Sequence, residues 1–221
     1  KVGDPANINS ASGAETARWF MVSDTPPERD IEGTTGGVDG AHRIVQRVWR
    51  LVGAAAETGA PAGTACPADL GADAVALRRA THQTIAAVTG AVERLRVNSA
   101  VAQSYELARA LSSGLQATSG ATAKDEGLKF AIREAAETLV RLAAPMVPHL
   151  AEECWEILGN QGLVAEQPWP EADSALLTED TVTIAVQVNG KRRGELTIAR
   201  DAGKEDIEAA ALALDAVARS L

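Results

Sequence analysis

Aromatic residues make up only 3% of this 221-residue sequence, and cysteine occurs only at Cys66 and Cys154. The scarcity of aromatic side chains, together with the many Ala and Leu residues in the middle of the chain, favours packed helices over a β-sandwich. Neither cysteine has a CxxC partner or a neighbouring His/Cys cluster, so the pattern predicts neither a disulfide framework nor a zinc site. We therefore expect two inert thiols and no metal ligands.

Long apolar runs are also missing, because none approaches the roughly 18 residues needed to cross a bilayer. The first residues lack the basic-then-apolar pattern of a signal peptide. We expect no membrane partner and a cytoplasmic protein, since a reducing compartment suits free thiols. With 46% hydrophobic residues, the chain is long enough for one large or two modest domains.

Positive charge is in deficit: 21 Lys and Arg against 30 Asp and Glu give a net charge of −9. An acidic surface repels nucleic acid beyond about one Debye length, roughly 8–10 Å, so any RNA contact must be local. Residues 42–50 and 187–193 contain no acid and supply such local positive charge. Their arginines and lysine are Arg43, Arg47, Arg50, Lys191, Arg192 and Arg193.

Helical periodicity dominates the middle of the chain. We expect helices over residues 13–22, 38–52, 70–88, 100–111, 124–143 and 150–158. Asn98 is a suitable N-cap for the helix at 100–111, and Gly114 is suited to end it. The helix at 38–52 should turn one apolar face inward, formed by Val38, Ala41, Val45, Val48, Trp49 and Val52.

Beyond residue 170 the period changes from helical to alternating, which predicts a strand at 182–188. Asn189-Gly190 is a strong hairpin-turn signal, followed by a return strand at 193–199 and a helix at 201–214. A two-stranded hairpin covered by one helix is marginal alone, so we expect this last domain to be incomplete.

The predicted fold class is therefore mainly α: an antiparallel helical bundle followed by a small, truncated α+β domain with a β-hairpin and a helix. We expect a connector at 1–37, the helical bundle at 38–172 and the α+β domain at 173–221. The connector boundary rests on the glycines and successive prolines before residue 38.

Seven blocks of sequence carry a family resemblance. They lie at residues 13–18 (GAETAR), 26–30 (PPERD), 37–43 (GVDGAHR), 47–51 (RVWRL), 93–100 (ERLRVNSA), 144–153 (APMVPHLAEE) and 186–194 (VQVNGKRRG). In this order they resemble bacterial leucyl-tRNA synthetase, a class I aminoacyl-tRNA synthetase, over essentially the whole chain. Two positions depart from the family: Gly33 stands where a tryptophan is usual, and Gly203 where a Ser cap is common.

The resemblance implies the anticodon-binding bundle and part of the C-terminal tRNA-binding domain of a leucine–tRNA ligase. The implied partners are tRNA(Leu) and the upstream catalytic and editing domains of the same chain, in a monomer. The family's His-Ile-Gly-His signature and Lys-Met-Ser-Lys-Ser loop would lie upstream, so this part alone should be inactive. ATP with magnesium would serve the parent enzyme, and no cofactor is expected here.

The candidate tRNA-binding residues are Arg43, Arg47, Arg50, Arg94, Arg96, Lys191, Arg192 and Arg193, and no catalytic residues are predicted. Alternatively, Arg43, Arg47 and Arg50 form a solvated helix face with ion pairs to neighbouring helices, and Arg94 and Arg96 pair with Glu93 and Glu106. His149 would be a packed or capping residue, and residues 28–30 a salt-bridged turn. Two other functions remain open: the anticodon-binding region of an Ile, Val or Met synthetase, and a helical protein-interaction module.

Overall fold

The structure, a computed structural model, describes residues 5–23, 35–118, 125–178, 181–199 and 202–218. They divide into two compact units, Lys1–Asp173 and Ser174–Leu221. The sequence block at 26–30, Gly33 and Asp201 lie outside the described residues. The limits of the predicted connector, bundle and C-terminal domain stay a prediction.

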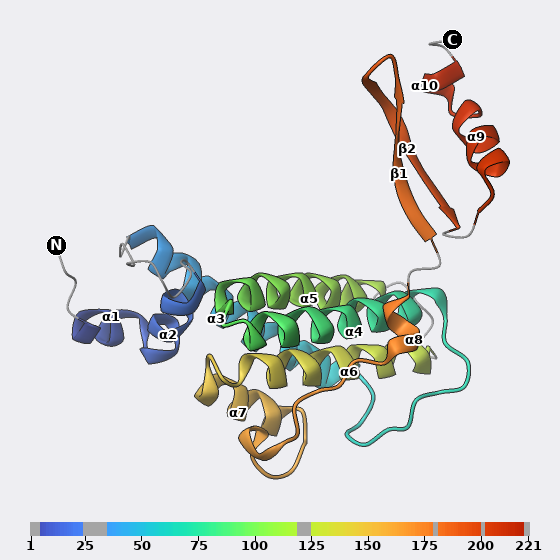
Figure 1. The fold of residues 1–221 in the computed structure, drawn as a ribbon. Helices are drawn as coiled ribbons and strands as arrows, with labels where there is room; N and C mark the ends of the chain where they lie inside the picture. Colours follow the sequence, from blue (N-terminus) through green and yellow to red (C-terminus); the bar gives the residue numbers. More distant parts are fainter. Residues whose placement is uncertain (1–4, 24–34, 119–124, 179–180, 200–201, 219–221) are drawn as a thin grey trace. The chain divides into compact units, whose positions relative to one another are not determined.

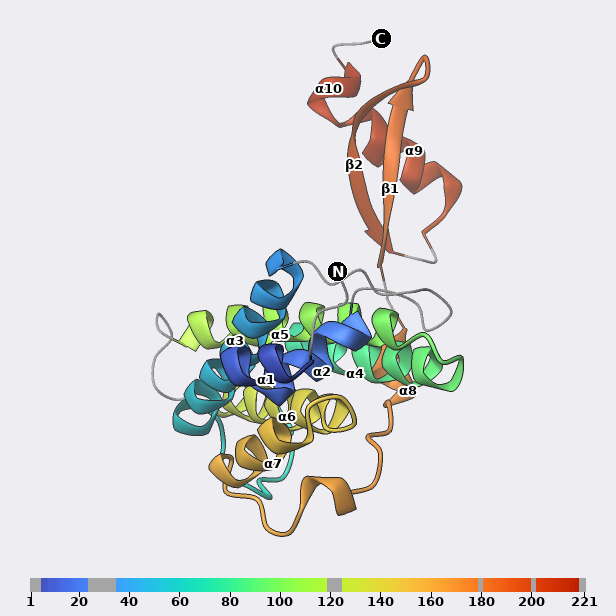
Figure 2. The ribbon, with the colours of Figure 1, turned by 90° about the vertical axis from the view of Figure 1, so that its left-hand side faces the viewer.

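The first unit is helical (Figures 1 and 2). Its elements are α1 (Pro5–Ser12), α2 (Ala14–Ser23), α3 (Thr35–Thr58), α4 (Ala72–Glu93), α5 (Val97–Thr118), α6 (Glu126–Ala143), α7 (Pro148–Ile157) and the 3-10 turn η1 (Val164–Glu166). Helices α4, α5 and α6 pack side by side, and α3 and α7 pack against α6. The predicted mainly helical class is confirmed. Among the described residues, no helix is both long and apolar enough to span a membrane.

Helix α6 lies at the centre of the bundle, with twelve of its 18 residues buried. Its small side chains Ala131, Ala135 and Ala136 are fully buried and let neighbouring helices approach closely. Large apolar side chains fill the remaining space, and burying each contributes about 1.5–3 kcal/mol. They include Leu107, Leu111, Leu128, Ile132 and Leu139.

Helix α5 differs from its prediction at both ends. It begins at Val97, because the Ser99 and Ala100 N–H groups donate to the Arg96 carbonyl at 3.0 and 3.2 Å. Asn98 therefore lies inside the first turn and is not the N-cap. Gly114 does not end the helix either: a Cβ there would lie 2.8 Å from Leu77 Cδ2, so the glycine permits close packing of α4 on α5.

Two of the sequence blocks, far apart in the chain, meet where α2 packs beside α7. One Glu15 oxygen accepts from Arg18 at 2.7 Å and lies 3.0 Å from His149 Nδ1, while the other accepts the Leu150 N–H at 3.4 Å. Glu15 therefore links α2 to the start of α7. His149 is exposed, so the expectation of a packed histidine is wrong.

Helix α2 is anchored by aromatic packing. Trp19 and Phe20 are buried in a second apolar cluster with Val101 and Met146. The Trp19 indole donates to the Tyr105 hydroxyl at 3.0 Å, and the two rings meet edge to face with centroids 5.9 Å apart. Residues 14–23 are thus an integral part of the first unit.

A partly buried polar cluster joins α4, α6 and the end of the first unit. Glu134 accepts two hydrogen bonds from Arg78, at 2.8 and 3.1 Å, and lies 3.3 Å from His82 Nε2. His82 Nδ1 accepts the backbone N–H of Asp173 at 3.0 Å, which fixes Nε2 as the donor to Glu134. Burial opposes the charge on Glu134, but the His82 and Arg78 hydrogen bonds outweigh it and lower the pKa of this carboxyl.

The second unit comprises α8 (Ser174–Leu177), a hairpin of β1 (Thr181–Val188) and β2 (Lys191–Ala199), and the helices α9 (Lys204–Leu212) and α10 (Asp215–Ala218). The strands are antiparallel and joined at Asn189-Gly190, both with positive φ, as a tight hairpin requires. Helices α9 and α10 both contact β2, and Val217 is buried. The predicted final helix is therefore two short helices, with Gly203 at the N-cap of the first.

Candidate nucleic-acid interface

The three arginines of α3 follow each other at spacings of four and three residues and share one side of the helix. Arg43 and Arg50 are exposed and Arg47 is half-buried. The Nε atoms of Arg43 and Arg50 donate to the carbonyls of Asp39 and Gln46 at 3.2 and 3.3 Å, which holds both side chains along the helix. None of the three forms an ion pair within the described part of the chain.

The opposite side of α3 is buried as predicted at Ala41, Val48 and Val52. Trp49, which the periodicity placed on this face, is instead 42% exposed. Its position is about 100° around the helix from Val48, so it falls between the buried stripe and Arg50. This is a correction to the predicted inward face.

Arg94 and Arg96 lie in the tight turn between α4 and α5, and both are exposed. The first residue of α5, Val97, packs on the same apolar cluster as Val38 and Val45 of α3. The structure thereby places this turn at the same end of the bundle as Arg43. The expected pairing with Glu106 is not seen, because Glu106 pairs with Arg109 at 3.3 Å.

Lys191, Arg192 and Arg193 begin β2, directly after the hairpin turn, and all three are exposed. The strand register pairs Gln187 with Arg192 and Val186 with Gly194, so Arg193 is the extra residue of a β-bulge. The bulge interrupts the strict alternation of side chains. Arg192 and Glu195 consequently face the same way, since their partners Gln187 and Ala185 are two residues apart.

Arg192 accordingly forms an ion pair with Glu195, so this basic group is not free of acidic neighbours as predicted. Both side chains are largely exposed, so the pair contributes little to stability. Lys191 and Arg193 form no ion pair with any residue that the structure describes. Two uncompensated positive charges therefore remain at the hairpin tip.

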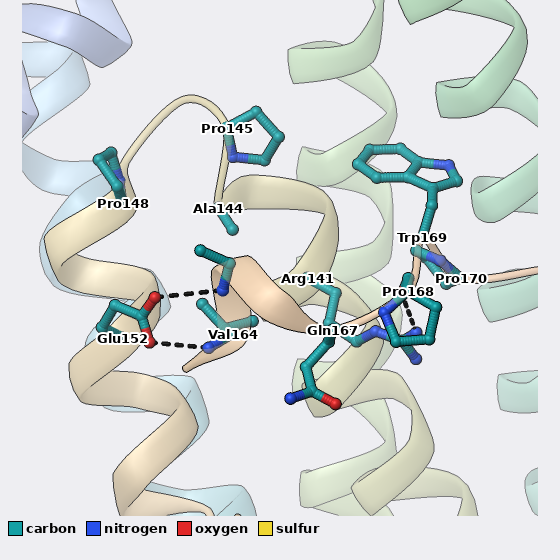
Figure 3. A pocket seen from close by; sticks show the side chains of 11 residues that line it. Arg141, Ala144, Pro145, Pro148, Glu152, Val164, Gln167, Pro168, Trp169 and Pro170 are labelled. Atoms are coloured by element: carbon teal, nitrogen blue, oxygen red, sulfur yellow. Dashed lines mark hydrogen bonds between the residues drawn. The ribbon is translucent and has the colours of Figure 1, made fainter. Parts of the chain in front are cut away.

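The segment after α7 crosses α6 and forms a mostly apolar pocket (Figure 3). Glu152 accepts the N–H groups of Val164 and Ala165 at 2.8 and 3.1 Å, while Arg141 donates to the Pro168 carbonyl. Trp169 donates to Thr89 at 2.8 Å. Glu152, Arg141 and Trp169 thus hold the segment 164–170 on the bundle, and burial lowers the pKa of Arg141.

No group of three or more His, Cys, Asp or Glu side chains that could hold a metal occurs among the described residues. Cys66 is exposed, so its thiol is accessible to reagents, although we expected both thiols to be inert. Cys154 is buried, and that burial raises the pKa of its thiol to about 12. The exposed arginines and lysine can bind a polyanion through charge-assisted hydrogen bonds.

The first unit is an α-helical bundle with basic residues at one end, and the second unit contains a basic β-hairpin. This combination is typical of a tRNA-binding protein. The model of the anticodon-binding domain of tRNA ligases matches residues 75–209, and the chain belongs to this family.

The relatives are leucine–tRNA ligases. Those of Parvibaculum lavamentivorans and Rhodopseudomonas palustris are 54% and 52% identical, each over 99% of this chain. The chain spans only about a quarter (24%) of each relative's length. The sequence resemblance to leucyl-tRNA synthetase is therefore confirmed.

Two solved structures of aminoacyl-tRNA synthetases resemble this chain. A LeuRS from Agrobacterium radiobacter, in a ternary complex with tRNA and LeuAMS, superposes with a TM-score of 0.77 at 28% identity. The match covers 99% of this chain and 28% of that one. Methionyl-tRNA synthetase of Mycobacterium tuberculosis shares the fold over 72% of this chain and 35% of its own, with a TM-score of 0.55 and 15% identity.

Proposed function

We propose that this chain is the tRNA-binding part of a leucine–tRNA ligase. It holds tRNA(Leu) in register while a catalytic domain elsewhere in the parent enzyme performs leucylation with ATP and magnesium. The parent acts in the cytoplasm as a monomer. This chain contributes affinity and positioning, and by itself it is inactive.

The observation that carries the proposal is the placement of Arg43, Arg94 and Arg96 at one end of the bundle. They are exposed and form no ion pair within the described ranges, although acids outnumber bases by 30 to 21 in the sequence. An acidic protein would neutralise these guanidinium groups internally if they served only to balance charge. The planar guanidinium group of arginine can donate hydrogen bonds to phosphate oxygens and to the ribose edges of paired RNA.

The hairpin tip provides a second cationic group. Lys191 and Arg193 stay uncompensated, and Arg192 exchanges Glu195 for phosphate. The bulge at Arg193 adds an exposed cation without lengthening the strand pairing. Two basic groups on separate units allow contacts with separate regions of an L-shaped tRNA, and the second contact then gains from effective concentration.

Titration of the chain with transcripts of bacterial tRNA(Leu) and tRNA(Val), followed by fluorescence anisotropy, tests the proposal. We expect tighter binding of tRNA(Leu), and weaker binding when Arg43, Arg47 and Arg50 are replaced with Ala. The matched control is Arg109→Ala, which removes an exposed helical arginine already paired with Glu106 and should leave affinity unchanged. Equal loss in both variants would contradict the assignment of the α3 arginines.

The alternative of a helical protein-interaction module finds its support in the net charge of −9. It predicts no tRNA binding near 0.15 M salt. Preference for tRNA(Val) would instead support an anticodon-binding region of a related synthetase. The same titration therefore separates all three functions.

A further inference from the structure

The turn between α4 and α5 contains a leucine in a backbone conformation that favours glycine. Helix α4 ends with two hydrogen bonds, from the Arg96 N–H to the Ala91 carbonyl at 2.8 Å and from the Leu95 N–H to the Val92 carbonyl at 2.9 Å. These are the two bonds of a Schellman motif, in which the residue after the C-cap adopts the left-handed conformation. That residue is Leu95, with a φ of 56°.

The same chain contains the usual form of this motif at the end of α7. There the Gly159 N–H donates to the Glu156 carbonyl at 2.7 Å and the Asn160 N–H to the Trp155 carbonyl at 3.3 Å. Gly159 has a φ of 76°. A glycine adopts this conformation without steric penalty, whereas a leucine reduces the folding equilibrium constant roughly tenfold.

Packing among the described residues does not offset this strain. Leu95 is 71% exposed, more than any other large hydrophobic side chain among the described residues. Val92, one helical turn before it, is also exposed. The turn thus exposes an apolar side chain to solvent at a position whose positive φ usually requires glycine.

The residues on either side of Leu95 indicate which kind of partner would cover it. The Arg94 guanidinium lies back along α4, 3.8–4.0 Å from where a Cβ on Gly90 would be, and Arg96 is exposed. Neither arginine forms an ion pair with a described residue. Although Glu93 lies nearby, residues 93–96 carry a net positive charge around the apolar tip. Such a tip complements a strand with negative phosphates on its outside and apolar sugar and base faces between them.

We propose that Leu95 is an RNA-contacting residue whose side chain packs on a ribose or base face while Arg94 and Arg96 contact the flanking phosphates. This inference rests on the proposed function and deepens it. The strain in the free protein is the cost of presenting an apolar contact already fixed in position.

Replacing Leu95 with Gly in the whole chain separates the two effects, because glycine keeps the turn and removes only the side chain. We expect the melting temperature to rise by about 2–4 °C. The dissociation constant for a tRNA(Leu) transcript should rise about fivefold to tenfold. The slope of log affinity against log salt should stay unchanged, since no charge is removed. Leu95→Asn, which also tolerates positive φ, should behave similarly.

The matched control is Leu163→Gly, at an exposed leucine with ordinary extended φ, directly before η1. It should neither raise the melting temperature nor weaken RNA binding. An unchanged affinity in Leu95→Gly would overturn the inference, including the case in which this side chain contacts another part of the parent ligase. The proposed function would still stand if Arg94→Ala and Arg96→Ala weaken binding. Absence of tRNA binding by the unaltered chain would overturn both.

Discussion

Replacing Glu134 with Gln should destabilise the helical unit far more than the same change at an exposed glutamate. Glu134 faces Arg78 through two hydrogen bonds and His82 through a third contact, and the three side chains are 20%, 15% and 10% exposed. Glutamine keeps the size of the side chain but removes its charge. It also turns an NH₂ group towards a donor, either Arg78 or His82.

The magnitude follows from the degree of burial. Breaking a fully buried ion pair by removing one partner costs about 3–5 kcal/mol, whereas a solvent-exposed pair contributes only about 0–1 kcal/mol. The partly exposed Glu134 cluster lies between these limits, and solvent screening reduces the larger figure. We therefore expect Glu134→Gln to lower the free energy of unfolding by about 2–3 kcal/mol.

Urea denaturation followed by far-ultraviolet circular dichroism measures this change. The matched control is Glu106→Gln, which breaks a pair with Arg109 whose side chains are 62% and 69% exposed. The control should shift stability by less than about 0.5 kcal/mol. Equal midpoints for the two variants would refute the view that this cluster holds α4 on α6. Adding Arg78→Met to Glu134→Gln should recover part of the loss, because the unpaired buried charge is removed.

Further expectations concern pH, packing and the thiols. The folded-state pKa of Glu134 is lowered, so its contribution to stability is present above the unfolded-state pKa of about 4.3 and is lost as the pH falls through the folded-state value. The free energies of unfolding of the wild type and Glu134→Gln should therefore converge in acid. Gly114→Val should lower the free energy of unfolding by about 1–3 kcal/mol, because the added side chain overpacks the contact with Leu77. Gly53→Ala adds a Cβ in open space on α3 and should raise the free energy of unfolding by about 0.5–1 kcal/mol, as measured by thermal melts. At pH 8, Ellman's reagent should modify Cys66 rapidly and Cys154 only after unfolding, and rapid reaction of both thiols would contradict the buried position of Cys154.

Periodicity alone predicted the helices well, because apolar residues at three- and four-residue steps leave few other ways to bury a face. Val48 and Val52 are buried as expected. Trp49 follows the same spacing but lies at the margin of the stripe, where a one-residue step of about 100° decides between core and solvent. The failure at Gly114 has a different cause: close packing against Leu77 is a tertiary contact that α5 does not reveal by itself.

The basic residues of the candidate site could be proposed from the sequence, whereas the neighbouring side chains that set their accessibility and pairing could not. Arg192 and Glu195 are three residues apart and would lie on opposite faces of a regular strand, and only the bulge at Arg193 brings them together. The sequence did not single out Leu95, because a leucine between two arginines is equally compatible with a helix. Its significance comes from the positive φ of its backbone and the exposure of its side chain, which depend on the three-dimensional structure of the turn.

We propose that two locally cationic surfaces of this chain bind a polyanion although its net charge is −9. The most direct measurement is the salt dependence of tRNA(Leu) affinity between about 50 and 200 mM KCl. Each phosphate contact should contribute about 0.7–0.9 to the slope of log affinity against log salt. Replacing Lys191, Arg192 and Arg193 with Ala should therefore reduce the slope by about 2–3. A slope identical to that of the unaltered chain would show that the hairpin residues do not contact phosphates.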